Sequence, residues 1–295
     1  MSLLSSKVAP MMHSDRCTQP RLTAHAEPDT MSVEYHPAFG PALPTMNWVP
    51  APRYLMRRDL LLRLFRERDP GRVLEFGCGS GALLAELAAG GFTATGIEQS
   101  DSALHLARWM TAGQPGVKIL TDAAGEAQAS YDYLAAFEVL EHIENDQDTL
   151  KAWAGYLRPG GTAILSVPAH PERWNPADIW AGHFRRYRCE DLHRLAEAAG
   201  LVVEKVVCYG FPLANIMEKI AAPIYERQLA KPTKEELDQA GRTGESGTDR
   251  RLLTRLWPIY STFPARYAVQ GALALQRRFL GSDRGIGYIL IARKP

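Results

Sequence analysis

The chain has 295 residues, of which 46% are hydrophobic and 23% are charged. These proportions are typical of a globular protein, and they exclude a collagen-like chain, a disordered tail protein and a small disulfide scaffold. Lys and Arg total 34 against 33 Asp and Glu, a formal net charge of +1, so we expect no nucleic-acid partner. The chain has no long uncharged apolar stretch and no signal-peptide pattern, so we expect a cytoplasmic protein without a transmembrane segment.

The four cysteines are Cys17, Cys78, Cys189 and Cys208. They form no CxxC pair, and no cluster of His and Cys has the spacing of a zinc finger. We therefore expect reduced thiols and no bound metal.

In chain order, residues 1–33 mix polar residues, Pro and Met without a period, which predicts a disordered arm. Residues 34–69 hold a segment rich in Pro and aromatic residues, predicted to pack across the fold, and then a helix that begins at Pro52. Between residues 70 and 210, short apolar runs alternate with helical patterns. Strands are predicted at 72–76, 93–98, 117–121, 131–139, 162–167 and 201–209, and helices at 82–89, 101–110, 145–157 and 190–199. This alternation predicts an α/β fold with a doubly wound parallel sheet.

Residues 211–284 are predicted to be a helical insertion, because loops of that length without structure are rare in compact domains. Two apolar stretches in it flank a polar tract at 231–251, whose glycine-rich half is predicted to be a flexible loop. Residues 285–295 contain the last predicted strand. The insertion could cap a hydrophobic substrate, form a homodimer face or contact a membrane surface peripherally, and these alternatives stay open.

The strongest motif is Glu75-Phe-Gly77-Cys78-Gly79-Ser-Gly81, between a predicted strand and a predicted helix. A doubly wound sheet binds its cofactor at such a turn, because glycines allow a ligand to approach the backbone. The spacing is GxGxG, whereas the dinucleotide fingerprint is GxGxxG, so the motif argues against an NAD or nucleotide-sugar enzyme.

Acidic residues follow the next three predicted strands. Glu98 could accept both hydroxyls of a ribose, Asp122 could receive the exocyclic amine of adenine, and Glu138 ends the fourth strand. The glycine loop is undamaged, and Glu98 is present where a ribose could bind. Both observations argue against a non-catalytic binding module that only retains the fold.

Together the stretches EFGCGSG, GIEQS, TDA, FEVLEH and LRPGGTAILSVP resemble the motifs of class I S-adenosylmethionine-dependent methyltransferases. The resemblance covers about residues 70–210 and the last strand, and it implies a Rossmann-like sheet of seven strands with the last one antiparallel. It also implies S-adenosylmethionine as cofactor, S-adenosylhomocysteine as product and the segment near residues 35–50 as a lid over the cofactor. By this resemblance the cofactor-binding residues are Glu75, Gly77, Cys78, Gly79, Gly81, Glu98, Gln99, Asp122, Ala123 and Glu138.

Residues for the methyl acceptor are expected after the fourth and fifth strands. An imidazole suits proton removal at neutral pH, so the candidate bases are His142, His170 and His183. The segment from Pro168 to Tyr187 also resembles a GHxRRY pattern of bacterial methyltransferases. We expect Trp174, Arg185, Arg186 and Tyr187 to contact the acceptor, with an arginine on an anionic group of it.

The function that these features favour is methyl transfer to an oxygen nucleophile of a hydrophobic small molecule of natural-product, lipid or glycan type. The alternatives are N- or C-methylation of a small molecule, and methylation of RNA or protein. A [DN]PPY-type motif for amide methylation is absent from the sequence.

Overall fold

The computed structural model describes residues 32–230 and 250–295. The chain divides into Met1–Ser32 and Val33–Pro295, and the account below concerns the second unit. The disordered arm predicted for residues 1–33 lies almost wholly outside the described residues, as does the glycine-rich loop predicted within residues 231–251.

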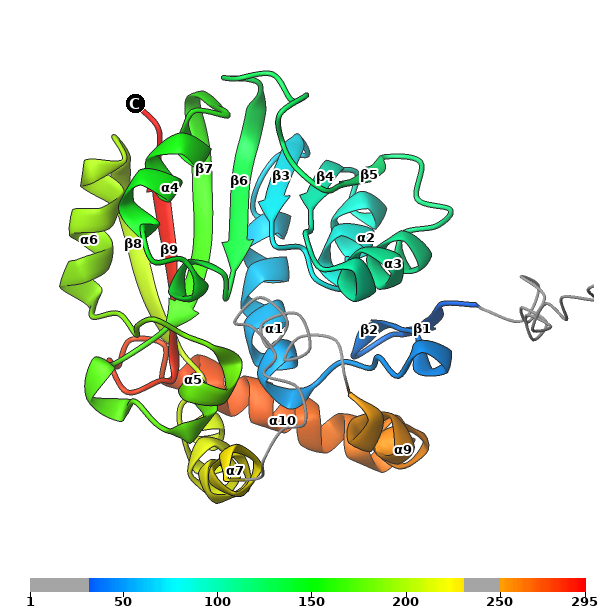
Figure 1. Cartoon of the computed structure of the whole chain (residues 1–295). Helices are drawn as coiled ribbons and strands as arrows, with labels where there is room; N and C mark the ends of the chain where they lie inside the picture. The colour runs from blue at the N-terminus through cyan, green and yellow to red at the C-terminus, as the bar shows by residue number, and fades with distance from the viewer. Residues whose placement is uncertain (1–31, 231–249) are drawn as a thin grey trace, which may run out of the picture. The chain divides into compact units, whose positions relative to one another are not determined.

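Seven strands form one sheet in the order β5-β4-β3-β6-β7-β9-β8 (Figure 1). Their bounds are β3 (Arg72–Phe76), β4 (Thr93–Ile97), β5 (Val117–Leu120), β6 (Tyr131–Phe137), β7 (Leu157–Pro168), β8 (Val202–Tyr209) and β9 (Gly287–Arg293). β3 to β7 pair in parallel, and β9 lies antiparallel between β7 and β8. The predicted fold class, with its antiparallel last strand, is confirmed.

Successive residues of the central strands pack on opposite faces of the sheet, as the period of two of a strand requires. Leu74 and Leu134 belong to the core on the face that α4 (Asp146–Ala154) and α6 (Cys189–Ala198) cover. Their neighbours Val73 and Ala135 belong to the core beneath α1 (Pro52–Arg66), α2 (Ala82–Ala89) and α10 (Phe263–Arg278). Burial on both faces explains why these strands are almost continuously apolar.

The segment before α1 is packed, as predicted. β1 (Glu34–His36) and β2 (Gly40–Ala42) form a small antiparallel hairpin, and a short helix, η2 (Pro44–Met46), follows. Phe39 and Trp48 are almost fully buried. Below this hairpin Arg58 of α1 pairs with Glu86 of α2, and both side chains are buried, so the two helices are joined by a charge-assisted contact.

The insertion between β8 and β9 is helical in its described part, as predicted. It contains α7 (Leu213–Leu229), α9 (Arg251–Tyr260) and α10. The buried Gln276 of α10 donates from Nε2 to the carbonyl oxygen of Met56 and accepts from the amide of Gly210, at 2.9 and 3.0 Å. These contacts anchor the insertion to α1 and to the end of β8.

One element boundary was predicted wrongly. The helix expected through Leu157 ends at Ala154, and Leu157 begins β7 and pairs with Tyr131. The reason is a long-range hydrogen bond: the amide of Tyr131 donates to the carbonyl oxygen of Tyr156 at 3.0 Å, so the chain has already joined the sheet before Pro159.

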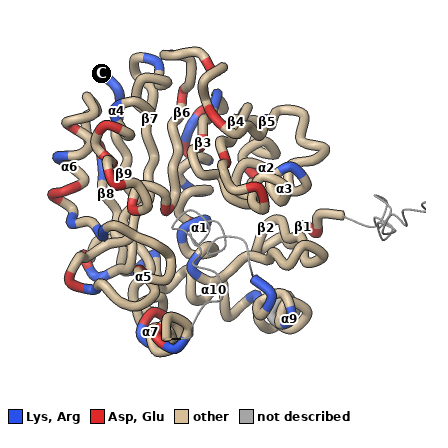
Figure 2. Tube along the Cα trace, viewed as in Figure 1, with Lys and Arg blue, Asp and Glu red and all other residues tan. Residues whose placement is uncertain are grey.

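Charged residues of both signs are interspersed along α6, α7 and the chain around α5 (Pro176–Ala181), as Figure 2 shows. In the described part of the chain, no helix combines the length and apolar character needed to cross a membrane.

Candidate active site

A large cavity lies at the carboxyl ends of β3, β4 and β6. Its volume is about 1260 Å³, above the roughly 300–1,000 Å³ usual for a small-molecule site, so it has room for two ligands. The glycine loop lines one part of it. Side chains of α5, α7 and α9 line another, among them Trp180, Met217, Tyr225 and Leu253. The helical insertion therefore contributes directly to the cavity wall.

The glycine loop connects β3 to α2 and is fastened to the end of β4. The amides of Gly77 and Cys78 donate to the carbonyl oxygen of Ile97 at 2.8 and 3.1 Å. Gly77 has φ +67°, and a Cβ there would lie 2.5 Å from a methyl of Val139, so the turn requires glycine. Gly79 also has a positive φ, but nothing lies within 4 Å of a Cβ built on it, which leaves open space beside the backbone. Gly81 instead begins α2 as its N-cap.

Glu98 holds this loop with its carboxylate. It accepts hydrogen bonds from the amides of Gly79, Gln99 and Ser100 at 2.8, 2.9 and 2.9 Å. Oε2 of Glu98 thus holds the glycine loop and Oε1 holds the chain after β4, and Glu98 lines the cavity.

Glu75 is buried beneath the glycine loop and lines the cavity. Its Oε2 atom has no hydrogen-bond partner. Burial raises the pKa of this carboxyl to about 8, although Arg57 opposes the shift. A buried carboxyl oxygen without a donor is costly unless a ligand supplies one.

The remaining residues predicted for the cofactor side also line the cavity. Asp122 accepts the amide of Ala124 through Oδ1 at 2.9 Å, in a tight turn after β5, and Ala123 is buried beside it. Cys78 and Gln99 complete this part of the wall.

Glu138 sits at the end of β6 in a left-handed conformation, with φ +60°. Its carboxylate pairs with Arg53 at 2.8 Å and Arg57 at 3.4 Å and accepts from the hydroxyls of Ser166 and Tyr209, both at 3.1 Å. Burial alone would raise the pKa of Glu138, but the two guanidinium groups lower it to about 2. Glu138 is therefore an ionised, fully engaged carboxylate and not a proton acceptor.

Arg53 and Arg57 were not predicted as site residues. Both line the cavity from α1. Their spacing of four on a helix was a usable signal, because it puts both cations on one face.

His142 ends the short helix η3 (Leu140–His142) after β6, and its ring centroid lies 4.7 Å from that of His183. Burial and the nearby His183 lower the pKa of His142 to about 4, so this imidazole is neutral at physiological pH. The adjacent Glu141 is fully buried, and neither of its carboxyl oxygens has a hydrogen-bond partner. Burial and the charge of Glu138 raise the pKa of Glu141 well above its ordinary value.

His183 lies just after α5, and its Nδ1 is 2.9 Å from Oδ1 of Asp178. Burial would raise the pKa of Asp178, but its hydrogen bonds with His183 and Arg186 lower it to about 2. An ionised carboxylate only accepts, so Nδ1 of His183 carries the hydrogen in this contact. In the neutral form of the ring, the second nitrogen is then the acceptor. Both histidines line the cavity.

One group of side chains in this cavity could hold a cation. Ligand atoms of Glu141, His142 and His183 all lie within 4.8 Å of one another. The expectation that no metal takes part stays a prediction.

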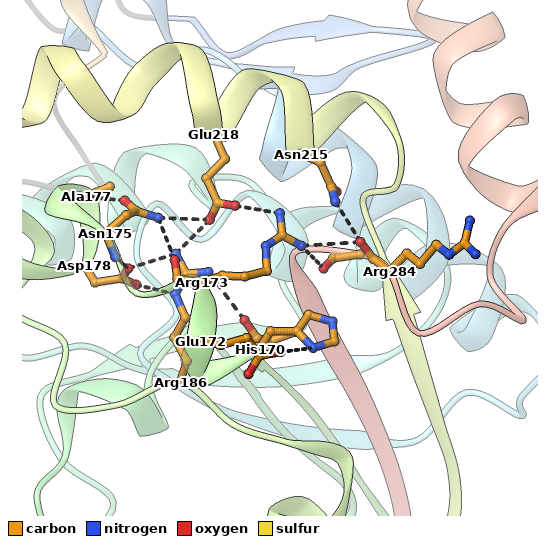
Figure 3. A network of polar contacts seen from close by, with 12 residues as sticks. His170, Glu172, Arg173, Asn175, Ala177, Asp178, Arg186, Asn215, Glu218 and Arg284 are labelled. Carbon is orange, nitrogen blue, oxygen red and sulfur yellow. Dashed lines mark hydrogen bonds and ion pairs between the residues drawn. The ribbon is translucent and has the colours of Figure 1, made fainter.

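Arg186 is buried and does not present a free cation to the cavity. Its guanidinium bonds Asp178 and Glu218 of α7, at 2.8 and 2.7 Å (Figure 3). Arg173, at the end of η4 (Pro171–Arg173), bonds the other oxygen of Glu218 at 2.8 Å. This Glu218 network joins the loop after β7 (residues 169–187) to the insertion.

Four predicted acceptor residues are not among the described residues that line the cavity: His170, Trp174, Arg185 and Tyr187. Arg185 pairs with Asp146 at 2.8 Å, and the hydroxyl of Tyr187 donates to Asp146 at the same distance. Trp174 is 40% exposed. Protein carboxylates engage both Arg185 and Arg186, and the expectation that one of them holds an anionic group of the acceptor stays a prediction.

A family model described as a methyltransferase domain matches residues 51–206, more than half of the chain. The chain belongs to this methyltransferase family. It is an enzyme whose cofactor is S-adenosylmethionine, and the matched region contains the glycine loop and the ends of β3 to β7.

Two curated relatives of this methyltransferase are ubiquinone biosynthesis O-methyltransferases. The protein from Aeromonas salmonicida (strain A449) is 30% identical over 165 residues, 49% of this chain and 68% of the relative. The protein from Rickettsia felis (strain ATCC VR-1525 / URRWXCal2) is 37% identical over 99 residues, 32% of this chain and 40% of the relative.

A solved structure similar to this methyltransferase is phosphoethanolamine N-methyltransferase 2 of Haemonchus contortus in complex with S-adenosyl-L-methionine. The TM-score is 0.50 at 15% sequence identity, over 81% of this chain and 52% of that chain. At this identity the likeness supports the fold.

Proposed function

We propose that this methyltransferase methylates a hydroxyl group of a hydrophobic small molecule. The observation that carries the proposal is that the Asp178–His183 pair opens onto the same cavity as the glycine loop. A hydroxyl is a weak nucleophile until its proton is removed, and a histidine oriented by a carboxylate is suited to remove it. The two curated relatives, both named O-methyltransferases, support the same reaction.

The residues around the glycine loop fit S-adenosylmethionine. The unpartnered Oε2 of Glu75 would accept from the amino group of the methionine part, and the open side of Gly79 leaves room for the ligand. Glu98 would hold the ribose hydroxyls and Asp122 the adenine amine. When bound, this cofactor supplies a methyl group already activated on a sulfonium sulfur.

The other end of the cavity would hold the acceptor. His183 would accept the hydroxyl proton on its second ring nitrogen, while the neutral His142 stands beside it. The same cavity has an aromatic part of its wall, where the rings of Trp180 and Tyr225 are 5.0 Å apart. Such a wall favours a ring-bearing or aliphatic acceptor and excludes water from the transfer.

Isosteric acceptor pairs test the reaction class directly. We would incubate the protein with methyl-labelled S-adenosylmethionine and hydrophobic phenols, each matched by the aniline of the same skeleton. We expect label on the phenol oxygen and much less on the aniline nitrogen. Preferential label on nitrogen or carbon would overturn O-methylation, and formation of labelled RNA or protein instead would overturn a small-molecule acceptor.

The proposed place of Glu75 predicts proton release on cofactor binding. With a pKa of about 8, Glu75 is mostly protonated at neutral pH in the free protein. A cationic amino group beside it favours the carboxylate, so binding near pH 7 should release close to one proton, and less as the pH rises beyond about 8. Calorimetry in buffers of different ionisation enthalpy measures this number.

The matched variants are Glu75→Gln and Glu204→Gln, the second on the exposed side of β8. Glu75→Gln should abolish the proton release, and Glu204→Gln should leave it unchanged. Proton release that persists in Glu75→Gln would contradict the proposed contact.

A further inference from the structure

A second cluster of donor side chains lies at the same edge of the sheet but outside the cavity wall. Cys208 is near the end of β8, His170 follows β7, and Asp283 lies in the loop before β9. These strands are neighbours in the order β7-β9-β8, and the start of the antiparallel β9 meets the ends of the other two. The topology therefore brings together three residues that are far apart in sequence.

The side chains of Cys208 and Asp283 both approach Nε2 of His170. Nε2 of His170 is 3.9 Å from Sγ of Cys208 and 3.7 Å from Oδ1 of Asp283. All the ligand atoms of this group lie within 4.8 Å of one another. A tetrahedral zinc ion with bonds of about 2.3 Å to sulfur and about 2.0 Å to nitrogen and oxygen would separate its ligands by roughly 3.3–3.6 Å. The two separations from Nε2 of His170 need to contract by only a few tenths of an ångström.

Each donor has the supporting contact that metal ligands have. Nδ1 of His170 is 3.5 Å from a carboxylate oxygen of Glu172 (Figure 3). This contact orients the ring, and Nε2 faces Cys208 and Asp283. The amide of Gly285 donates to Sγ of Cys208 at 3.0 Å, and the hydroxyl of Tyr288 donates to Asp283 at 2.6 Å.

The backbone of His170 is also unusual. Its φ is +65°, a conformation that costs free energy in a residue with a Cβ. Its amide donates to the carbonyl oxygen of Tyr187 at 2.9 Å, and its carbonyl oxygen accepts from the amide of Arg173, so both neighbours hold it in place. Residues kept in such conformations cluster at ligand sites.

We propose that His170, Cys208 and Asp283 bind a zinc ion, with a water molecule as the fourth ligand. Thiolate, imidazole and carboxylate together select zinc over the harder magnesium and calcium ions. Binding displaces the thiol proton of Cys208 to solvent, so the metal replaces one S–H bond with one S–Zn bond. The ion would fix the start of the loop that carries Asp178 and His183.

The geometry favours a metal over a nucleophilic cysteine. In a relay, the thiol and one carboxylate engage opposite nitrogens of the imidazole. Here Cys208 and Asp283 both face Nε2, while Glu172 faces Nδ1. In addition, Cys208 is buried and is not among the described residues that line the cavity.

Cobalt substitution tests the site with a signal that does not depend on activity. We would remove metals from the full chain, add Co²⁺ and record the absorption spectrum. We expect one equivalent to bind with tetrahedral d–d bands and a thiolate-to-cobalt charge-transfer band, and Zn²⁺ to displace it. The cluster of Glu141, His142 and His183 has no sulfur and cannot produce that band.

Single-residue variants test whether the metal binds at His170 and Cys208. Cys208→Ser should lose the charge-transfer band, and Glu172→Gln should weaken Co²⁺ binding about 10- to 100-fold by freeing the ring of His170. The control is His193→Gln on the exposed face of α6, which should bind as the unaltered protein does. No charge-transfer band in the unaltered protein, or a band that survives in folded Cys208→Ser, would overturn the proposal.

Discussion

His183→Ala is expected to lower kcat by about 100- to 10,000-fold, the range that a positioned general base contributes. In the proposed reaction, the second ring nitrogen of His183 would accept the proton while Asp178 orients the ring. Because the proposal puts this imidazole on the acceptor side of the cavity, the Kd for S-adenosylmethionine should stay unchanged. Steady-state kinetics with the best phenol and calorimetry with the cofactor measure the two quantities separately.

Two comparisons separate a base from a structural histidine. His193→Ala, on the exposed face of α6, should leave kcat unchanged. The fall in kcat at acidic pH, which reports protonation of the base, should disappear in His183→Ala and remain in His193→Ala. Full activity of His183→Ala would refute the assignment, and a comparable loss only in His142→Ala would transfer the role to that residue.

Glu98→Ala is expected to raise the Kd for S-adenosylmethionine by at least about 100-fold. Hydrogen bonds to a charged acceptor contribute about 1.5–3 kcal/mol each, and the proposed contact has two ribose hydroxyls on one carboxylate. The same carboxylate holds the amides of Gly79, Gln99 and Ser100, so its removal also loosens the glycine loop. Calorimetric titration of the folded variant gives the change directly.

Glu98→Gln separates the loss of the negative charge from the loss of the hydrogen-bond acceptor. An amide oxygen still accepts, but it lacks the charge, so the Kd should lie between those of the unaltered protein and Glu98→Ala. Glu204→Ala on β8 is the control for loss of an exposed glutamate, and its Kd should be unaltered. Equal affinities of Glu98→Ala and the control would refute the proposed place of the ribose.

Local patterns predicted the sheet and the strand ends well. Glycines that need a positive φ, such as Gly77, leave a signal in the sequence, and so do apolar runs that are buried on both faces. Parallel strands then bring their carboxyl ends to one edge, which is why Glu75, Glu98 and Asp122 line one cavity.

Contacts between distant segments were less predictable. Arg53 and Arg57 pair with Glu138 from a helix more than eighty positions earlier in the chain. No local sequence pattern predicts that pairing. His170 was expected beside the acceptor because it follows β7. Its left-handed backbone and the bond from its amide to Tyr187 direct the side chain to Cys208 instead.

The Glu218 network has a consequence for exchanging parts between enzymes. Glu218 belongs to the insertion, whereas Arg173 and Arg186 belong to the loop after β7, and all three side chains are largely buried. A chimera that receives a foreign segment for residues 211–284 alone would leave Arg173 without its carboxylate and Arg186 with Asp178 only. Preference for a given methyl acceptor should therefore transfer between relatives only when residues 169–187 are exchanged together with the insertion as one unit.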